Sequence, residues 1–182
     1  QPTATWKPEN SKRYRMTKEQ KAEIEELRRQ AEVKTAEKYT QAAQRAQSIW
    51  DRAEDCVKHE YLENKQVLSY GLKKDTHDNL VIPMKDGQGT IVGLQFIAAD
   101  GAKRFLTGSK KSGSFFLLGR EIFNSSDTLN YAEGYATAAS IYADRSQPVV
   151  VAFDAFNLSP VAEVMYKYFP NHKHVFVADN DD

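Results

Sequence analysis

Acidic side chains follow each of three short hydrophobic segments in the C-terminal third of the chain. These acidic residues are Glu133, Asp154, Asp179 and Asp181. Taken singly, a carboxylate after a strand is commonly a turn former or a helix cap. If the strands belong to one parallel sheet, however, the carboxylates share an edge, where they repel each other unless a cation lies among them. Hard oxygen ligands in this number favour Mg²⁺ or Mn²⁺, and such metal sites are typical of phosphoryl transfer.

The segments that must position these carboxylates alternate between strand and helix character. Strands are predicted at 129–132, 148–153 and 174–178, and helices at 135–144 and 159–169. This alternation predicts a parallel βαβαβ sheet with right-handed crossovers, whose strand ends meet along one edge. Ser159-Pro160 has the signature of a helix start. Gly134, directly after Glu133, would let the chain turn sharply and leave room for a ligand.

The preceding stretch, from 79 to 118, has the character of an antiparallel meander. Its predicted strands are 80–84, 90–97, 103–106 and 115–118, separated by Gly-containing turns. Basic residues gather in and after the third strand, and they are Lys103, Arg104, Lys110 and Lys111. Cations beside Gly and Ser suit phosphate binding, although an ordinary solvated loop has the same composition. The loop lacks the P-loop pattern.

The N-terminal third is predicted to be a basic leader, 1–16, followed by one long helix over 17–57. Thr17 and Gln20 have the spacing of a capping box, and Gly and Pro are absent until Gly71. Apolar residues recur at helical spacing only in the second half of the helix, so that half is expected to dock on a core. The first half is expected to project or to pack on another partner, as a scaffold or linker.

Composition narrows the class of protein. The 182 residues carry 25 basic and 25 acidic side chains, so net charge gives no case for nucleic acid. No apolar run is long enough to span a membrane, and the protein is not expected to bind one. The single cysteine, Cys56, excludes a disulfide framework or a multi-cysteine zinc site, and a cytoplasmic location follows. The chain does not begin with Met, so it is expected to be a piece of a longer protein.

Two motifs resemble a known domain. Tyr131-Ala132-Glu133-Gly134-Tyr135 and the later Asp179-Asn180-Asp181 resemble the TOPRIM domain of bacterial-type primases, type IA and II topoisomerases and some nucleases. The segments 90–97, 103–106 and 115–119 are similar to the N-terminal part of the primase catalytic core. The segment 59–62 resembles the entry of primases from phages, plasmids and mobile elements. The resemblance thus covers about 58–182 and implies a mixed α/β, TOPRIM-like fold.

The resemblance also implies roles for particular residues. Glu133, Asp179 and Asp181 would hold the catalytic Mg²⁺ or Mn²⁺ ions. The cations Lys103, Arg104, Lys110 and Lys111 would border the path of template and nucleotide. Cellular bacterial primases often carry another Asp four residues after the glutamate, where this chain has Thr137. We expect Asp154 to supply that carboxylate to the metal.

The expected domains are 1–57, leader and long helix; 58–128, the antiparallel subdomain; and 129–182, a TOPRIM domain that is truncated at its C-terminal end. The expected function is metal-dependent synthesis of RNA primers on single-stranded DNA from ribonucleoside triphosphates, in phage, plasmid or mobile-element replication. A replicative helicase is an expected partner, and the bacterial cytoplasm is the expected location. Two alternatives stay open: a TOPRIM nuclease, and a non-catalytic module that binds single-stranded DNA or a helicase. A topoisomerase is disfavoured because no separate tyrosine-bearing domain is evident.

Overall fold

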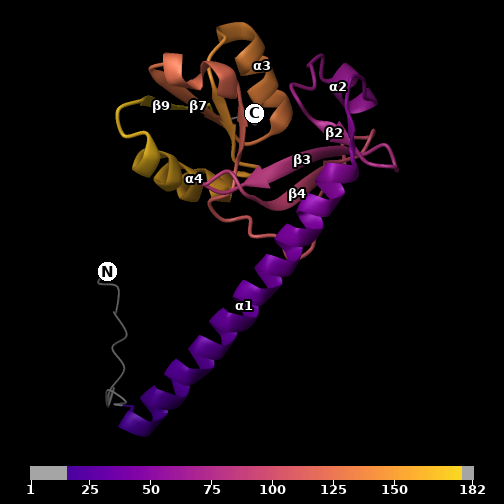
Figure 1. Ribbon diagram of the computed structural model, residues 1–182. Helices are drawn as coiled ribbons and strands as arrows, with labels where there is room; N and C mark the ends of the chain where they lie inside the picture. Colours follow the sequence, from indigo (N-terminus) through magenta and orange to yellow (C-terminus); the bar gives the residue numbers. More distant parts are fainter. Residues whose placement is uncertain (1–15, 178–182) are drawn as a thin grey trace, which may run out of the picture. The chain divides into compact units, whose positions relative to one another are not determined.

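The computed structural model describes residues 16–177 (Figure 1). In chain order, the elements are α1 (Lys18–Arg52), β1 (Glu54–Asp55), α2 (Glu60–Asn64), β2 (Lys73–Lys74), β3 (Leu80–Lys85), β4 (Ile91–Ile97), β5 (Lys103–Phe105), β6 (Phe116–Leu118), the 3-10 helix η1 (Arg120–Ser125), β7 (Thr128–Ala132), α3 (Tyr135–Arg145), β8 (Val149–Val151), α4 (Ala155–Tyr168) and β9 (Lys173–Phe176). The chain divides into two compact units, Gln1–Ala36 and Glu37–Asp182. The three-domain division expected from the sequence stays a prediction. No helix in the described part is long and apolar enough to cross a membrane.

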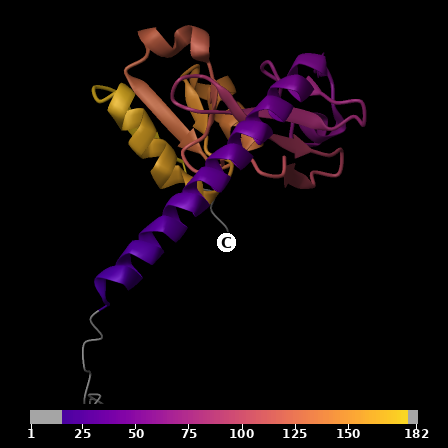
Figure 2. The same cartoon turned by 60° about the horizontal axis from the view of Figure 1, so that its bottom comes forward.

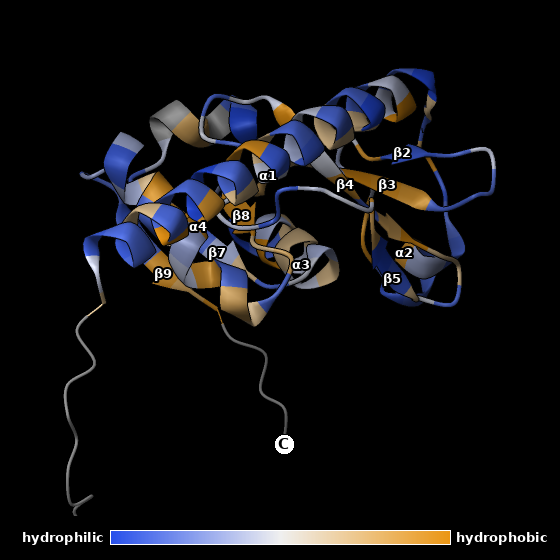
Figure 3. Ribbon diagram, turned by 90° about the horizontal axis from the view of Figure 1, so that it is seen from below, coloured by the Kyte–Doolittle hydropathy of each residue, from blue (hydrophilic) through white to orange (hydrophobic). Residues whose placement is uncertain are grey.

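The described part of the first unit is the N-terminal part of α1. The predicted capping box is confirmed, since the backbone N–H of Gln20 donates to Thr17 Oγ1 at 3.2 Å and that of Thr17 donates to Gln20 Oε1 at 3.0 Å. Helical propensity is high here, but Leu27 and Val33 remain 59% and 51% exposed. Figure 3 shows how hydrophilic α1 is along its length.

The second half of α1 docks on a sheet, as its apolar spacing predicts. Ala42 and Ala46 are fully buried, and Ile49 and Trp50 pack against the cluster that contains Ala46. Figure 2 shows the course of this half of α1 across the rest of the ribbon. The helix ends at Arg52, so the expectation that it reaches residue 57 is wrong. The chain leaves the helix early because Glu54–Asp55 forms a short edge strand with Lys73–Lys74.

The first sheet has five antiparallel strands in the order β1-β2-β3-β4-β5. This order follows the chain, and tight turns join the consecutive strands from β2 to β5, whereas the segment from β1 to β2 contains α2. Both faces are covered. Leu80, Ile82 and Ile97 face the core shared with α3, whereas Val81, Leu94 and Phe96 face α1. Because side chains alternate along each strand, one face of the sheet packs toward α3 and the other toward α1.

The second sheet has the order β6-β8-β7-β9, with β7 parallel to both β8 and β9. The predicted parallel βαβαβ unit is thus confirmed. Helix α3 covers one face through Ala138 and Ala139, and α4 covers the other through Val161 and Met165. Figure 1 shows the two helices on either side of β7 and β9. Burial on both faces explains the unbroken apolar character of β8, whose three residues are all valine.

Two local predictions are wrong. The segment 115–118 does not continue the antiparallel meander, since β6 pairs with β8 and only the Lys85–Phe115 bridge joins it to the first sheet. Pairing with the buried β8 covers both Phe116 and Leu118, which a meander edge would expose. Helix α4 begins at Ala155 and not near Ser159-Pro160, because Asp154 caps it directly after β8.

Candidate active site

Glu133 lies at the carboxyl end of β7, the strand with parallel neighbours on both sides. The strand is anchored by Leu129 and Tyr131, which are fully buried. Glu133 itself is partly exposed, and no hydrogen bond or ion pair joins its carboxylate to another group among residues 16–177. A carboxylate at this edge that pairs with no other described group can bind a cation or a substrate.

Gly134 connects Glu133 to α3 and serves as the N-cap of that helix. Its φ of −117° is open to any residue, so the backbone at this turn does not depend on the conformational freedom of glycine. A Cβ built at Gly134 would lie 3.6 Å from Nζ of Lys103, an ordinary contact. The same distance shows that the Lys103 ammonium reaches the start of α3, beside Glu133.

The neighbouring strand β8 ends at a strained turn. Phe153 is buried and has a φ of 74°, a left-handed conformation that is rare for a bulky residue. Such strain concentrates at functional sites, where surrounding structure enforces it. Here the turn directs Asp154 to the N-terminus of α4, where its Oδ1 accepts a hydrogen bond of 2.9 Å from the backbone N–H of Asn157.

Asp154 also forms an ion pair with Lys111, through its Oδ2. The Lys111 ammonium lies 5.1 Å from the ring centroid of Phe105, and the Phe105 ring contacts that of Phe153 edge to face. This group therefore links β5, the loop 107–114, which we call the basic loop, and the end of β8. It places a cation at the carboxyl edge and already uses both oxygens of Asp154.

The four basic residues predicted to line one path do not lie together. Lys103 and Arg104 are adjacent on β5, so their side chains point to opposite faces of the sheet. Arg104 stacks on Phe96 at 4.3 Å, on the face covered by α1. Lys110 lines a separate hollow of about 270 Å³ with residues such as Lys167 of α4. Of the predicted cations, the structure thus places Lys103 and Lys111 nearest to the carboxyl edge.

The remaining acidic residues of the predicted metal site, Asp179 and Asp181, lie outside the described residues. Strand β9 leads toward them in the expected direction. It runs parallel to β7, and the Val177 N–H donates to the carbonyl of Tyr131 at 2.9 Å. The chain thus passes residue 177 at the edge where Glu133 begins its turn.

The carboxylates at this edge are the candidate ligands for the divalent cation that the sequence implies. Within the part of the chain that the structure describes, no three His, Cys, Asp or Glu side chains gather closely enough to hold a metal. Glu133 offers a hard oxygen donor, which fits Mg²⁺ or Mn²⁺. Asp154 has the same chemistry, but its two oxygens are held by Asn157 and Lys111.

Asn157 is an important residue that the sequence did not reveal. Its buried side chain donates to the carbonyls of Ser114 and Ala152 at 2.9 and 2.8 Å, and it accepts from the N–H of Gly113 at 2.8 Å. It thereby ties the end of the basic loop to β8 and α4. The only sequence signal was the Asp-x-x-Asn spacing, which also occurs in ordinary caps.

Comparisons with known proteins agree with this architecture. DNA primase TraC of Escherichia coli is 34% identical over 193 aligned positions, which cover 98% of this chain and 13% of that protein. Another DNA primase TraC of Escherichia coli is 37% identical over 125 positions, covering 67% of this chain and 12% of that protein. The chain therefore corresponds to a small part of these relatives. No protein-family model matches it.

Among solved structures, the primase fragment of the bacteriophage T7 primase-helicase protein aligns with a TM-score of 0.51. The alignment covers 73% of this chain and 59% of that chain, at 19% identity, and it shows a shared fold. The resemblance to primases that the sequence suggests is therefore confirmed: this chain is related to a segment of the DNA primases TraC and has the fold of a phage primase fragment.

Proposed function

We propose that the chain carries the catalytic core of a primase-type nucleotidyltransferase. It would synthesise RNA primers on single-stranded DNA during phage, plasmid or mobile-element replication. The observation that carries the proposal is the Glu133 carboxylate at the carboxyl end of β7, which pairs with no group among residues 16–177, with the Lys103 ammonium reaching the adjoining helix start. Relatedness to proteins named DNA primase supports the same reaction.

In this proposal, Glu133, Asp179 and Asp181 hold Mg²⁺ or Mn²⁺, and Asp154 joins them if Lys111 is displaced. When bound, the metal would neutralise charge on the triphosphate and favour ionisation of the attacking 3′-hydroxyl. The direction of β9 supports this assignment, since it brings the chain to the Glu133 edge at Val177.

The lysines have complementary roles in the proposal. Lys103 and Lys111 would attract the phosphates of an incoming ribonucleoside triphosphate from two sides of the carboxyl edge. Lys111 is oriented for this role by Asp154 and Phe105. Lys110 would contact the template backbone farther from the reacting atoms, where sequence-independent contacts position a strand.

The setting of the reaction is part of the same proposal. We propose the predicted domains, with residues 129–182 supplying the metal-binding part and 58–128 supplying the cations. A helicase partner is supported by the origin of the T7 fragment in a primase-helicase protein. A bacterial cytoplasmic location is supported by the Escherichia coli relatives.

Primer synthesis on a single-stranded template, with ribonucleotides and Mg²⁺, tests the assignment. Glu133→Gln should lower the rate at least about 100-fold, because a ligand to the metal is lost. Glu163→Gln, at an exposed position of α4, is the matched control and should be fully active. Primer synthesis by Glu133→Gln at the wild-type rate would refute the proposal, whereas metal-dependent nicking of a plasmid without nucleotides would identify a nuclease instead.

A further inference from the structure

A second hollow lies between the end of α1 and the first sheet, and its lining includes none of the residues of the carboxyl edge. We call it the α1 hollow, and its volume is about 400 Å³. Its apolar lining is formed by Ile49, Phe96 and Leu106. This volume lies within the roughly 300–1,000 Å³ range of small-ligand sites. It opens on the sheet face opposite to the one from which Lys103 reaches Gly134.

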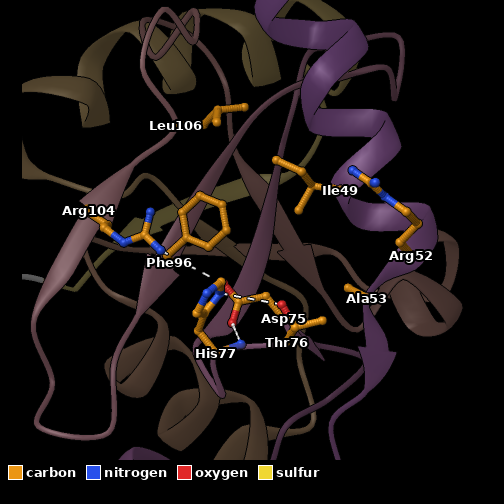
Figure 4. Close-up of a pocket in the computed structure, with 9 residues that line it drawn as sticks. All are labelled: Ile49, Arg52, Ala53, Asp75, Thr76, His77, Phe96, Arg104 and Leu106. Atoms are coloured by element: carbon orange, nitrogen blue, oxygen red, sulfur yellow. Dashed lines mark hydrogen bonds and ion pairs between the residues drawn. The ribbon is translucent and has the colours of Figure 1, made fainter.

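Cations border the apolar lining from different elements. Figure 4 shows Arg52 of α1 and Arg104 of β5 on opposite sides of Phe96 and Ile49. The Arg104 guanidinium lies 4.3 Å from the Phe96 ring centroid, and its side chain is 61% exposed. One guanidinium face is thus held on an aromatic ring while the side chain remains accessible. Such a plane can stack on a further flat group.

The hollow also has an acidic residue, Asp75, whose carboxylate already accepts hydrogen bonds from its own loop. Asp75 accepts hydrogen bonds from the backbone N–H groups of His77 and Asn79 at 2.9 Å, and its side chain is 14% exposed. Its contact with Arg104 is long, at 3.9 Å. Arg52 and Arg104 therefore present positive charge that the carboxylate of Asp75 does not fully offset.

The same sheet face carries another cation–aromatic pair. Lys73 lies 5.0 Å from the Trp50 ring centroid, and its Nζ donates to the Trp50 carbonyl at 3.1 Å. Phe96 is buried beneath Arg104, whereas Trp50 is partly exposed, and cations beside accessible aromatic rings are a pattern with which proteins bind single-stranded nucleic acid. A base inside a duplex cannot enter a hollow of this size unless it is flipped out.

We propose that the α1 hollow binds one nucleotide of the single-stranded template, on the opposite sheet face from the reaction. The base stacks on Arg104 above the apolar lining, and the flanking phosphates lie at Arg52 and Arg104. Arg104 thereby has a task separate from that of its neighbour Lys103. The choice of template as ligand rests on the proposed function, but the contact itself needs neither metal nor nucleotide.

Binding of labelled oligo(dT), followed by fluorescence anisotropy in EDTA and without nucleotides, tests the site. Arg52→Gln and Arg104→Gln should each raise the Kd about fivefold, since a rim ion pair is worth up to about 1 kcal/mol. The double variant should reduce the slope of log K against log salt by about 1.4. Thr76→Glu places a negative charge at the exposed rim and should weaken binding without removing any core contact.

Arg145→Gln, which removes the same charge from α3, is the matched control and should bind oligo(dT) normally. Glu133→Gln should also bind normally, so loss of primer synthesis in that variant and loss of binding here report on different sites. Unchanged affinity in all four hollow variants would overturn the inference. Equal competition by duplex DNA would overturn the placement of an unstacked base, and preferential competition by oligo(U) would identify the RNA strand as occupant instead.

Discussion

The two sheets of this protein are built in opposite ways. In the first, β1 to β5 follow one another along the chain, and short connections join β2 to β3, β3 to β4 and β4 to β5, whereas α2 lies between β1 and β2. In the second, β7 lies between β8 and β9, and the last strand of the antiparallel region, β6, is added at the edge. The first sheet is specified by local turns, and the second by crossovers and by packing of α3 and α4.

This difference in construction corresponds to a difference in role between the two sheets. The parallel sheet gathers candidate catalytic carboxylates, and the antiparallel sheet supports them. Parallel strands bring Glu133 and Asp154 to one edge although they are 21 positions apart in the chain. The antiparallel sheet has no such edge, and it contributes by aiming side chains to either face. Lys103 points toward the parallel sheet and Arg104 away from it. Substitutions can test how far this division holds.

The largest expected effect is at the junction of the two sheets. Asn157→Ala should lower the free energy of unfolding by about 3 kcal/mol, because buried groups of Gly113, Ser114 and Ala152 lose their partner. Chemical denaturation measures the loss. Asn171→Ala, at an exposed turn, should change stability by less than about 0.5 kcal/mol. Equal stability of the two variants would show that the basic loop does not depend on this junction.

The next effect concerns chemistry supplied by the antiparallel sheet. Lys103→Met should reduce the rate of primer synthesis about 100-fold with little change in stability, since one preorganised cation is lost from the carboxyl edge. Lys173→Met removes an equally exposed lysine at the start of β9 and should stay active. A fully active Lys103→Met variant would confine the chemistry to the second sheet.

A third prediction concerns support within the first sheet. Burial by itself would raise the pKa of Asp75, but hydrogen bonds from the Asn79 side chain and from the N–H groups of Asn79 and His77 outweigh it and lower the pKa. The ionised form therefore stabilises the fold above the ordinary Asp pKa of about 3.9, and this stabilisation disappears as the pH falls through the lowered value.

Asp75→Asn should accordingly cost about 1 kcal/mol at neutral pH. The difference from wild type should shrink below about pH 4. Denaturation as a function of pH measures it, with Asp144→Asn at an exposed position as control. A pH-independent difference would mean that the charge of Asp75 does not stabilise the loop.

The smallest effect concerns the ion pair that joins the sheets. The Lys111 and Asp154 side chains are 42% and 27% exposed, so the pair should contribute less than about 1 kcal/mol to stability. Lys111→Gln should nevertheless strengthen Mn²⁺ binding about fivefold in calorimetry, because Asp154 loses its resident cation. Lys110→Gln is the control. Weaker Mn²⁺ binding in Lys111→Gln would contradict competition between lysine and metal for Asp154.

Much of the fold could be predicted because its signals are local. The capping box at Thr17, the strand that ends before Glu133 and the crossover helix 135–144 all appear close to their predicted places. The assignment of 115–118 to the meander failed because an apolar strand pattern does not state its partner. The start of α4 was misplaced because Ser159-Pro160 imitates a cap, while Asp154 satisfies the true first turn.

The candidate site was predictable in part. The position of Glu133 and Asp154 at strand ends could be predicted because they follow apolar segments. The links from Lys111 to Asp154 and from Asn157 to the basic loop could not, because they span 43 or 44 positions. Such contacts leave no periodic pattern. The division of Lys103 from Arg104 follows from strand alternation, but only packing showed which face belongs to which site.

The sequence by itself determined the alternation of strands and helices, the carboxylate after each parallel strand and the local turns, because these depend on neighbouring residues. Tertiary structure decided the strand order, the use of Asp154 as cap and ion-pair partner, and which face of the first sheet each of Lys103 and Arg104 occupies. Those features depend on groups far apart in the chain, whose meeting is fixed only when both faces of each sheet are packed.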